Sequence, residues 1–291
     1  MKQQTVLFDA PGPLAARRTR IANIITVALV AVGIALVLVK LHEMDQLSPT
    51  RWGNALNANA WTNYYLPGLR FTLQASVIAV ITSMVFGLVF GFLRLAPFAP
   101  IRWFATIVVE FFRSVPVLVM MFFLYNYFAK VVASQGIINA ADAPYYAVIV
   151  GLTLYNGAVI AELIRSGVHT LPKGQREAAA AIGMTRNQSL AFVEVPQALV
   201  AMLPALMSQF VVILKDSALG YLIGFYEVLQ YARQLGSGQS NMLQTLVVAA
   251  VIFIILNYIL TWIAGRLARR LSSRTSGEVE PDTTTGVPAT V

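Results

Sequence analysis

The chain is dominated by long apolar blocks that carry few or no charges. Most of these blocks approach the roughly 20 residues that a helix needs to cross the core of a bilayer. A backbone in lipid must satisfy its own hydrogen bonds, and none of the blocks shows the alternation of a strand, so we predict that each is a helix. The six predicted spans are residues 21–39, 71–93, 104–128, 145–161, 198–214 and 242–265. The sequence therefore predicts an all-α integral membrane protein.

The basic residues predict how the chain is oriented in the membrane. Of the 291 residues, 57% are hydrophobic and 12% are charged, with 21 Lys and Arg against 13 Asp and Glu. If the amino terminus is cytoplasmic, most of the Lys and Arg fall on the inner side, which is the usual bias of membrane proteins. We therefore predict two cytoplasmic termini, and we explain the positive charge by topology rather than by binding to nucleic acid.

Three segments outside the spans have their own predicted character. Residues 1–20 form the cytoplasmic amino terminus, and residues 40–65 form an outer loop with an interfacial helix around "WTNYYLPGL". The tail, residues 272–291, is rich in Ser, Thr, Gly and Pro, and we predict that it is disordered.

The motifs of most enzyme classes are missing from this sequence. It contains no Gly-x-x-x-x-Gly-Lys-Ser/Thr loop, so any ATP must be hydrolysed by another protein. It has no Cys, and its two histidines, His42 and His169, fall in predicted loops on opposite sides of the membrane, which argues against a metal site. We predict no enzymatic activity, no metal and no cofactor in this chain.

A polar, alanine-rich insert separates the fourth and fifth blocks. It reads "GQREAAAAIGMTRNQSLAFVEVP", residues 174–196. The stretch "QREAAAAI" favours a helix, and Gly183 can end that helix in a left-handed conformation. The hydroxyl of Thr185 can cap a second helix. The insert is thus predicted to form two short helices that meet at a glycine corner.

An alanine-rich run alone is common in helices, but the spacing of the other residues in this insert forms a more specific pattern. Glu177-Ala178-Ala179 is followed after three residues by Gly183 and, after nine more, by "VEVP". This pattern resembles that of permease subunits of binding-protein-dependent ABC importers, with Val193 and Val195 replacing the usual Ile and Leu. The stretches "EFFRSVPVLVMMFF", "YNGAVIAELIRSGVHTLPKGQREAA" and "LKDSALGYLIG" resemble the polar amino-acid branch of that family, and the whole sequence is most similar to glutamate/aspartate-type permeases.

The resemblance implies a five-helix type I permease core over residues 66–265, with residues 21–39 as an extra helix. It also implies a coupling loop, residues 165–196, that docks on a cytoplasmic ATPase dimer carrying ATP and Mg²⁺. The implied coupling residues are Gln175, Glu177, Ala178, Ala179, Gly183, Met184, Thr185 and Arg186. Arg186 could contact either the ATPase or anionic lipid headgroups. The other implied partners are a second permease, similar or identical, and an extracytoplasmic amino-acid-binding protein.

Several polar side chains lie within or next to the predicted spans. Glu110 and Arg113 are three residues apart and share a helix face, and because the resemblance places them in a framework motif we predict that they clasp helices together. Glu162 and Arg165 are also three residues apart, at the inner end of the fourth span, and we count them as clasp candidates with a hinge or anchor role. Lys215 and Asp216 end the fifth span, before a short predicted helix, "SALGYLIGF", that would plug the outer mouth. The candidates for the pathway or for substrate contact are Asn156, Ser208, Gln209, Lys215 and Asp216. Hydrogen bonding between helices is the alternative role for the first three.

These features together predict a multi-pass permease of a prokaryotic plasma membrane, which forms the pathway of an ATP-driven importer for a polar amino acid, with glutamate or aspartate as the favoured cargo. The alternative is a secondary transporter or channel that moves a small polar solute along an ion gradient. That alternative requires transport to continue without any ATPase.

Overall fold

The computed structural model describes residues 12–273, and every regular element among them is helical. Within these residues, six helical runs are long and apolar enough to cross a membrane, which confirms the predicted all-α fold and its six spans. The runs are Pro13–Glu43, Ala58–Leu95, Val117–Gln135, Ala140–Thr170, Arg186–Ile223 and Met242–Leu267. Residues 1–11 of the predicted cytoplasmic amino terminus lie outside the described residues. Of the predicted tail, only residues 272 and 273 are described, at the end of the last helix.

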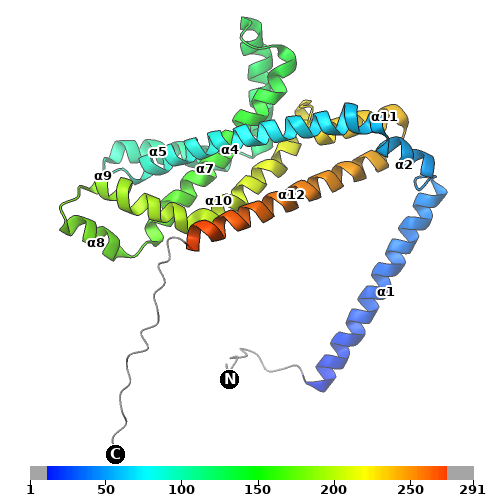
Figure 1. Cartoon of the computed structure of the whole chain (residues 1–291), viewed down its shortest axis with the longest axis horizontal. Coiled ribbons are helices and arrows are strands. Elements are labelled where there is room, and N and C mark those ends of the chain that lie inside the picture. Colours follow the sequence, from blue (N-terminus) through cyan, green and yellow to red (C-terminus); the bar gives the residue numbers. More distant parts are fainter. Residues whose placement is uncertain (1–11, 274–291) are drawn as a thin grey trace, which may run out of the picture.

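Four long helices make up the centre of the molecule. They are α4 (Leu66–Leu95), α7 (Ala143–Thr170), α10 (Val195–Ser217) and α12 (Met242–Ser273). At one end of this bundle lie α2 (Pro49–Leu56) and α11 (Val228–Gln239), and at the other lie α5 (Ala99–Ser114), α8 (Lys173–Ala181) and α9 (Arg186–Ser189) (Figure 1). We name these the α11 end and the α8 end.

Glycines allow α4 and α7 to approach each other closely. A Cβ atom added at Gly87 would lie 2.3 Å from the side chain of Ile160, and one added at Gly157 would lie 2.7 Å from Phe86. Small residues at such crossings allow van der Waals packing of the kind that drives helix association in membranes. The α4–α7 pair is therefore the tightly packed centre around which the other helices are placed.

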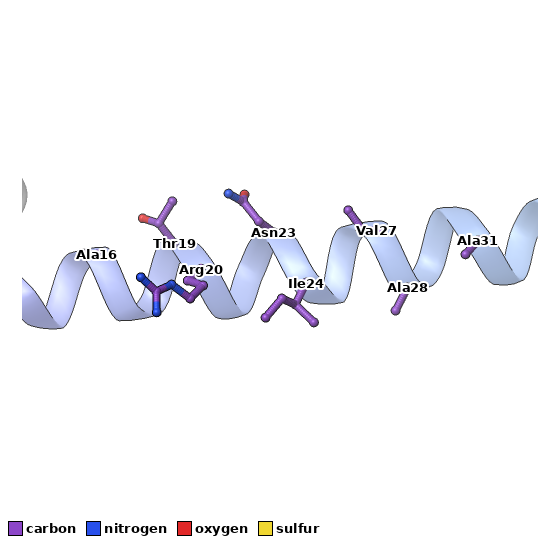
Figure 2. Close-up of a pocket in the computed structure, with 8 residues that line it drawn as sticks. All are labelled: Ala16, Thr19, Arg20, Asn23, Ile24, Val27, Ala28 and Ala31. Carbon is purple, nitrogen blue, oxygen red and sulfur yellow. The ribbon is translucent and has the colours of Figure 1, made fainter.

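The first helix, α1 (Pro13–Glu43), diverges from the bundle (Figure 1). None of its residues is buried. Figure 2 shows eight side chains between Ala16 and Ala31 that border a shallow surface, and all eight come from α1 itself. The apolar surface of this helix must therefore be covered from outside the chain, by lipid or by another subunit.

The third predicted span is wrong in one respect, because residues 104–128 do not form one helix. The structure divides them between α5 and α6 (Val117–Tyr127), with Val115 and Pro116 in extended conformations. Pro116 has no N–H group to donate, and its ring disfavours a helical conformation at the preceding residue. The membrane-spanning run continues instead beyond α6, through a π-helical turn, Phe128–Val132, and a 3₁₀ turn, Ala133–Gln135.

Other expectations about the loops also need correction. The segment around "WTNYYLPGL" is not a separate interfacial helix, because the short helix α3 (Ala58–Ala60) and a π-helical turn, Trp61–Tyr65, run directly into α4. The two histidines lie in the last turns of α1 and α7 rather than in loops. The short helix predicted after Lys215 and Asp216 is confirmed as a 3₁₀ helix, Ala218–Ile223.

A buried carboxyl group caps α11 at the α11 end of the bundle. Glu227 is fully buried, and its side chain accepts hydrogen bonds from the backbone N–H groups of Leu229 at 2.8 Å and Gln230 at 2.7 Å. The next residue, Val228, donates its N–H to the hydroxyl of Thr72 on α4. Burial raises the pKa of Glu227 to about 7, although the two backbone donors act in the opposite direction.

Because this pKa lies above its unfolded value, the folded protein holds the proton of Glu227 more tightly than the unfolded chain does. The free energy of unfolding should therefore fall as the pH rises towards 7, by on the order of 3 kcal/mol for this group, and then level off. We expect the midpoint of thermal unfolding to rise on acidification from pH 8 to pH 5 in the wild type, and much less in Glu227→Gln. Equal pH dependence in the two proteins would show that Glu227 is not the group responsible.

Candidate functional site

The polar insert forms the two helices and the glycine corner that the sequence predicts. After α8, Gly183 has φ +84°, in the left-handed region that glycine adopts most readily. The N–H of Gly183 donates to the carbonyl of Ala180, and the N–H of Met184 donates to the carbonyl of Ala179. These two bonds form a Schellman motif, which satisfies the last carbonyls of α8.

The second helix of the insert begins at a capping box. The hydroxyl of Thr185 accepts from the N–H of Gln188, and the side chain of Gln188 accepts from the N–H of Thr185 at 2.8 Å. This confirms Thr185 as the cap of α9 and leaves the start of a four-residue helix with its backbone donors satisfied. A π-helical turn, Leu190–Glu194, then joins α9 to α10.

One buried carboxylate holds the insert against the bundle. The side chain of Glu194 is 2% exposed. It accepts hydrogen bonds from the guanidinium of Arg186 and from the hydroxyl of Ser189, and it lies 3.6 Å from the Nε of Arg176. A carboxylate buried in this way is stable only when opposite charges and donors compensate for its lost hydration. Glu194 therefore ties both α8 and α9 to the start of α10.

The remaining side chains of the insert divide between an inner and an outer face. Ala179 is buried against the chain itself, whereas Glu177 and Ala178 are exposed. Gln175 is also exposed, and its side-chain oxygen accepts a hydrogen bond from Gln197 of α10 at 3.2 Å. The surface open to another protein thus includes Glu177 and Ala178 but not Ala179.

The two predicted clasps belong to one larger network. Arg94, whose side chain is 6% exposed, donates to Glu162 at 2.7 Å and to Glu110 at 3.0 Å. Arg113 pairs with Glu110 at 3.3 Å, and Arg165 pairs with Glu162 at 2.6 Å. A single guanidinium can bridge two carboxylates because its donors point in fixed directions. The network joins α4, α5 and α7 at the α8 end.

The candidate pathway residues do not form one cluster. Asn156 is fully buried and accepts a hydrogen bond from Gln209, so this pair connects α7 to α10. Ser208 is exposed and donates to the carbonyl of Pro204 in its own helix. Lys215 and Asp216 lie in the last turn of α10, towards the α11 end. For Asn156 and Gln209 the structure shows the interhelical hydrogen bond that was the alternative to a pathway role.

Sequence reasoning gave no role at this site to Arg94, Arg176 or Glu194. Arg94 and Arg176 are two of the basic residues whose distribution predicts the inner side of the membrane. Glu194 did carry a signal, since it is the single acid in the apolar run "LAFVEV". An acid flanked by apolar residues, close to Arg176 and Arg186, indicates a buried ion pair rather than a solvated surface.

Comparison with known proteins decides which family this arrangement belongs to. Residues 83–273 match the model of the binding-protein-dependent transport system inner membrane component. The chain belongs to this family. It is a permease subunit of an ABC importer, a transport component with several spans in the bacterial inner membrane.

Individual relatives of this permease are amino-acid permeases. It is 46% identical to the glutamate transport system permease protein GluD of Corynebacterium glutamicum, over 75% of this chain and 78% of that protein. It is 29% identical to the glutamate/aspartate import permease protein GltK of Escherichia coli O6:H1, over 67% of this chain and 87% of that one. In the crystal structure of an amino acid ABC transporter with histidines, a chain 28% identical to the permease superposes with a TM-score of 0.64, over 72% of the permease and 95% of that chain.

Loss of the charge on Glu194 should loosen the insert of the permease. Glu194→Gln leaves Arg186 and Arg176 without their carboxylate, and because both guanidinium groups are partly exposed we expect a cost of only about 1.4 kcal/mol. Amide hydrogen exchange in residues 173–189 should therefore become about tenfold faster. The matched control is Glu177→Gln, which neutralises an exposed carboxylate of the same insert. Equal exchange rates in the two variants would show that Glu194 does not hold the insert.

Proposed function

We propose that this permease, together with a second permease subunit, forms the transmembrane pathway through which an ATP-driven importer carries glutamate or aspartate into the cytoplasm. The observation that supports this cargo is the 46% identity, over three quarters of the chain, to a permease whose name specifies glutamate transport. The 29% identity to a glutamate/aspartate import permease agrees with it. The pathway itself requires two permeases, because the polar candidates of one chain do not enclose a channel of their own.

The observation that supports ATP-driven coupling is the construction of the insert. The helix α8 exposes Glu177 and Ala178, while Glu194 holds α8 and α9 to the start of α10. A surface that receives force from another protein must be both accessible and firmly attached to the part that moves. We therefore assign the insert as the contact with a cytoplasmic ATPase, which carries the ATP and Mg²⁺. Among the insert residues, we assign Arg186 to attachment through Glu194.

This assignment also orients the chain in the membrane. If the insert is cytoplasmic, the α8 end is the inner end and the α11 end is the outer end. The helix α12 starts near α11 and finishes at the α8 end, and α1 finishes near α2 at the α11 end (Figure 1). Both termini are then cytoplasmic, and the binding protein delivers cargo at the α11 end.

The transport cycle follows from two states that different partners stabilise. ATP binding draws the ATPase subunits together and moves the inserts with them. The ion pairs of Glu194 carry this motion to α10, and the Arg94 network keeps α4, α5 and α7 together as one unit. The outward-facing state is favoured to the extent that ATP and the loaded binding protein bind it more tightly than the inward-facing state.

Uptake in proteoliposomes tests this proposal directly. The permease is reconstituted with the second permease subunit, the ATPase and the binding protein, and uptake of labelled glutamate, aspartate, glutamine and arginine is measured with and without ATP on the ATPase side. We expect ATP-dependent uptake of glutamate or aspartate. We also expect Glu177→Lys to reduce the uptake at least tenfold, since it reverses a charge on the exposed face of α8; Glu43→Lys, an exposed acid on α1, is the matched control.

Three results would contradict different parts of the proposal. Uptake of arginine without uptake of glutamate would show that the cargo is wrong. Uptake that continues without the ATPase would favour transport driven by an ion gradient. Full activity of Glu177→Lys, with the ATPase still bound, would remove the exposed face of α8 from the coupling contact.

A further inference from the structure

A pocket of about 370 Å³ opens at the α11 end of the bundle. Its walls come from the start of α4, from the start of α7 and from the segment between the 3₁₀ helix and α11. Five aromatic rings line it: Phe71, Tyr145, Tyr146, Phe225 and Tyr226. The rings of Tyr145 and Tyr146 lie 5.6 Å apart, and those of Tyr145 and Phe225 lie 5.8 Å apart, so three of the five rings are in contact with one another.

The charge of this pocket is negative. Among the described residues that line it, Asp142 is the only one of the types Asp, Glu, Lys, Arg and His, and the other polar groups are the amide of Gln74 and the tyrosine hydroxyls. Asp142 is exposed, and it forms no ion pair with any residue from 12 to 267 whose side chain the structure describes. Aromatic faces attract cations through their negative quadrupole, and a nearby carboxylate adds to that attraction.

The position of the pocket restricts what can reach it. Phe71 belongs to the first turns of α4, and Asp142 directly precedes α7, so the pocket lies at the opposite end of the bundle from the insert. Under the proposed function, on which this inference rests, that end faces the binding protein. Exposed tyrosines such as Tyr146 and Tyr226 are typical of the level at which a membrane meets water.

We propose that this pocket is a docking site for the binding protein, and that it accepts one Arg or Lys side chain of that protein between its aromatic walls and the carboxylate of Asp142. Arginine stacks on aromatic rings and pairs with carboxylates at the same time, which fits both features of the pocket. The cargo itself does not fit, because glutamate and aspartate carry a net negative charge and no Lys or Arg lines the pocket to balance it.

Docking at this pocket would also connect the binding protein to the core of the permease. Phe225 is 3% exposed, and it packs in a core cluster with Leu152 of α7 and Ile213 of α10. Tyr145 packs against the same cluster. A side chain that fills the pocket would therefore contact Tyr145 and Phe225, and both of these pack in the cluster that includes residues of α7 and α10. The pocket and the insert lie at opposite ends of the same helices.

The test uses the complete complex of permease and ATPase in lipid nanodiscs. ATP hydrolysis is measured against the concentration of purified, glutamate-loaded binding protein from the same transport system. We expect Asp142→Asn to raise the half-saturating concentration of the binding protein about tenfold, which is the effect of losing one charged contact of about 1.4 kcal/mol. The maximal rate at saturation should stay the same. Raising the salt concentration should weaken docking of the wild type more than that of Asp142→Asn.

The matched control is Asp45→Asn, which removes an exposed carboxylate at the same end of the molecule, where Asp45 pairs with Arg51. This control should leave the half-saturating concentration unchanged. In a second arm, Asp142→Lys should dock poorly, and replacing the correct Arg or Lys of the binding protein with Glu should restore docking to this variant. That rescue would identify the partner residue.

Two results would overturn the docking site. The first is an unchanged half-saturating concentration in Asp142→Asn. The second is a defect of Asp142→Asn in the uptake of a cationic amino acid at saturating binding protein, which would make the pocket a cargo site. Failure of the proposed function looks different, because the wild-type complex would then show no stimulation of ATP hydrolysis by the binding protein.

Discussion

The ion pairs around Glu194 are the interaction on which the working geometry of this permease depends. A carboxylate that is 2% exposed loses almost all of its hydration, and it is stable only because Arg186, Ser189 and Arg176 replace the lost water. Those partners come from the two helices of the insert, whereas Glu194 itself directly precedes α10. The same electrostatic requirement that pairs the charge therefore fixes the insert to a membrane-spanning helix.

Buried charged groups have different hydrogen-bonding partners at the two ends of the bundle. At the α8 end, Arg94 and Glu194 each have oppositely charged partners, and the resulting networks bind helices to one another. At the α11 end, Glu227 is buried with backbone donors and no cation among its hydrogen-bond partners, so its pKa rises to about 7. The charged networks of the α8 end are thus suited to transmit force between helices. At the α11 end, Asp142 is exposed and has no ion-pair partner among the side chains described between residues 12 and 267.

Much of this fold could be predicted from sequence because its signals are local. The apolar blocks indicated six spans, and Gly183 and Thr185 marked the corner of the insert through backbone requirements that involve only their neighbours. Pro116 carried a local signal as well, but the apolar run around it outweighed the signal, and one helix was predicted where there are two.

The features that could not be predicted depend on residues that are distant in sequence. Arg94 and Glu162 are 68 positions apart, and no periodicity in the sequence indicates that they meet. Ala179 is buried because of the orientation of α8 about its own axis relative to the segment that follows it, and the sequence alone does not give that orientation. The aromatic pocket combines three segments between Phe71 and Tyr226, so it exists only once the helices have packed.

The central claim is that the insert moves as one body with the inner part of α10. The chain has no cysteine, so spin labels can be placed at single engineered sites without removing native thiols. Ile182 of the insert and Ala201 of α10 are both exposed and suit Ile182→Cys and Ala201→Cys. Pulsed electron paramagnetic resonance on the assembled complex should give the same distance between these two labels with and without ATP, while the distance between the inserts of the two permeases changes. A change between Ile182 and Ala201 as large as that between the inserts would contradict the account.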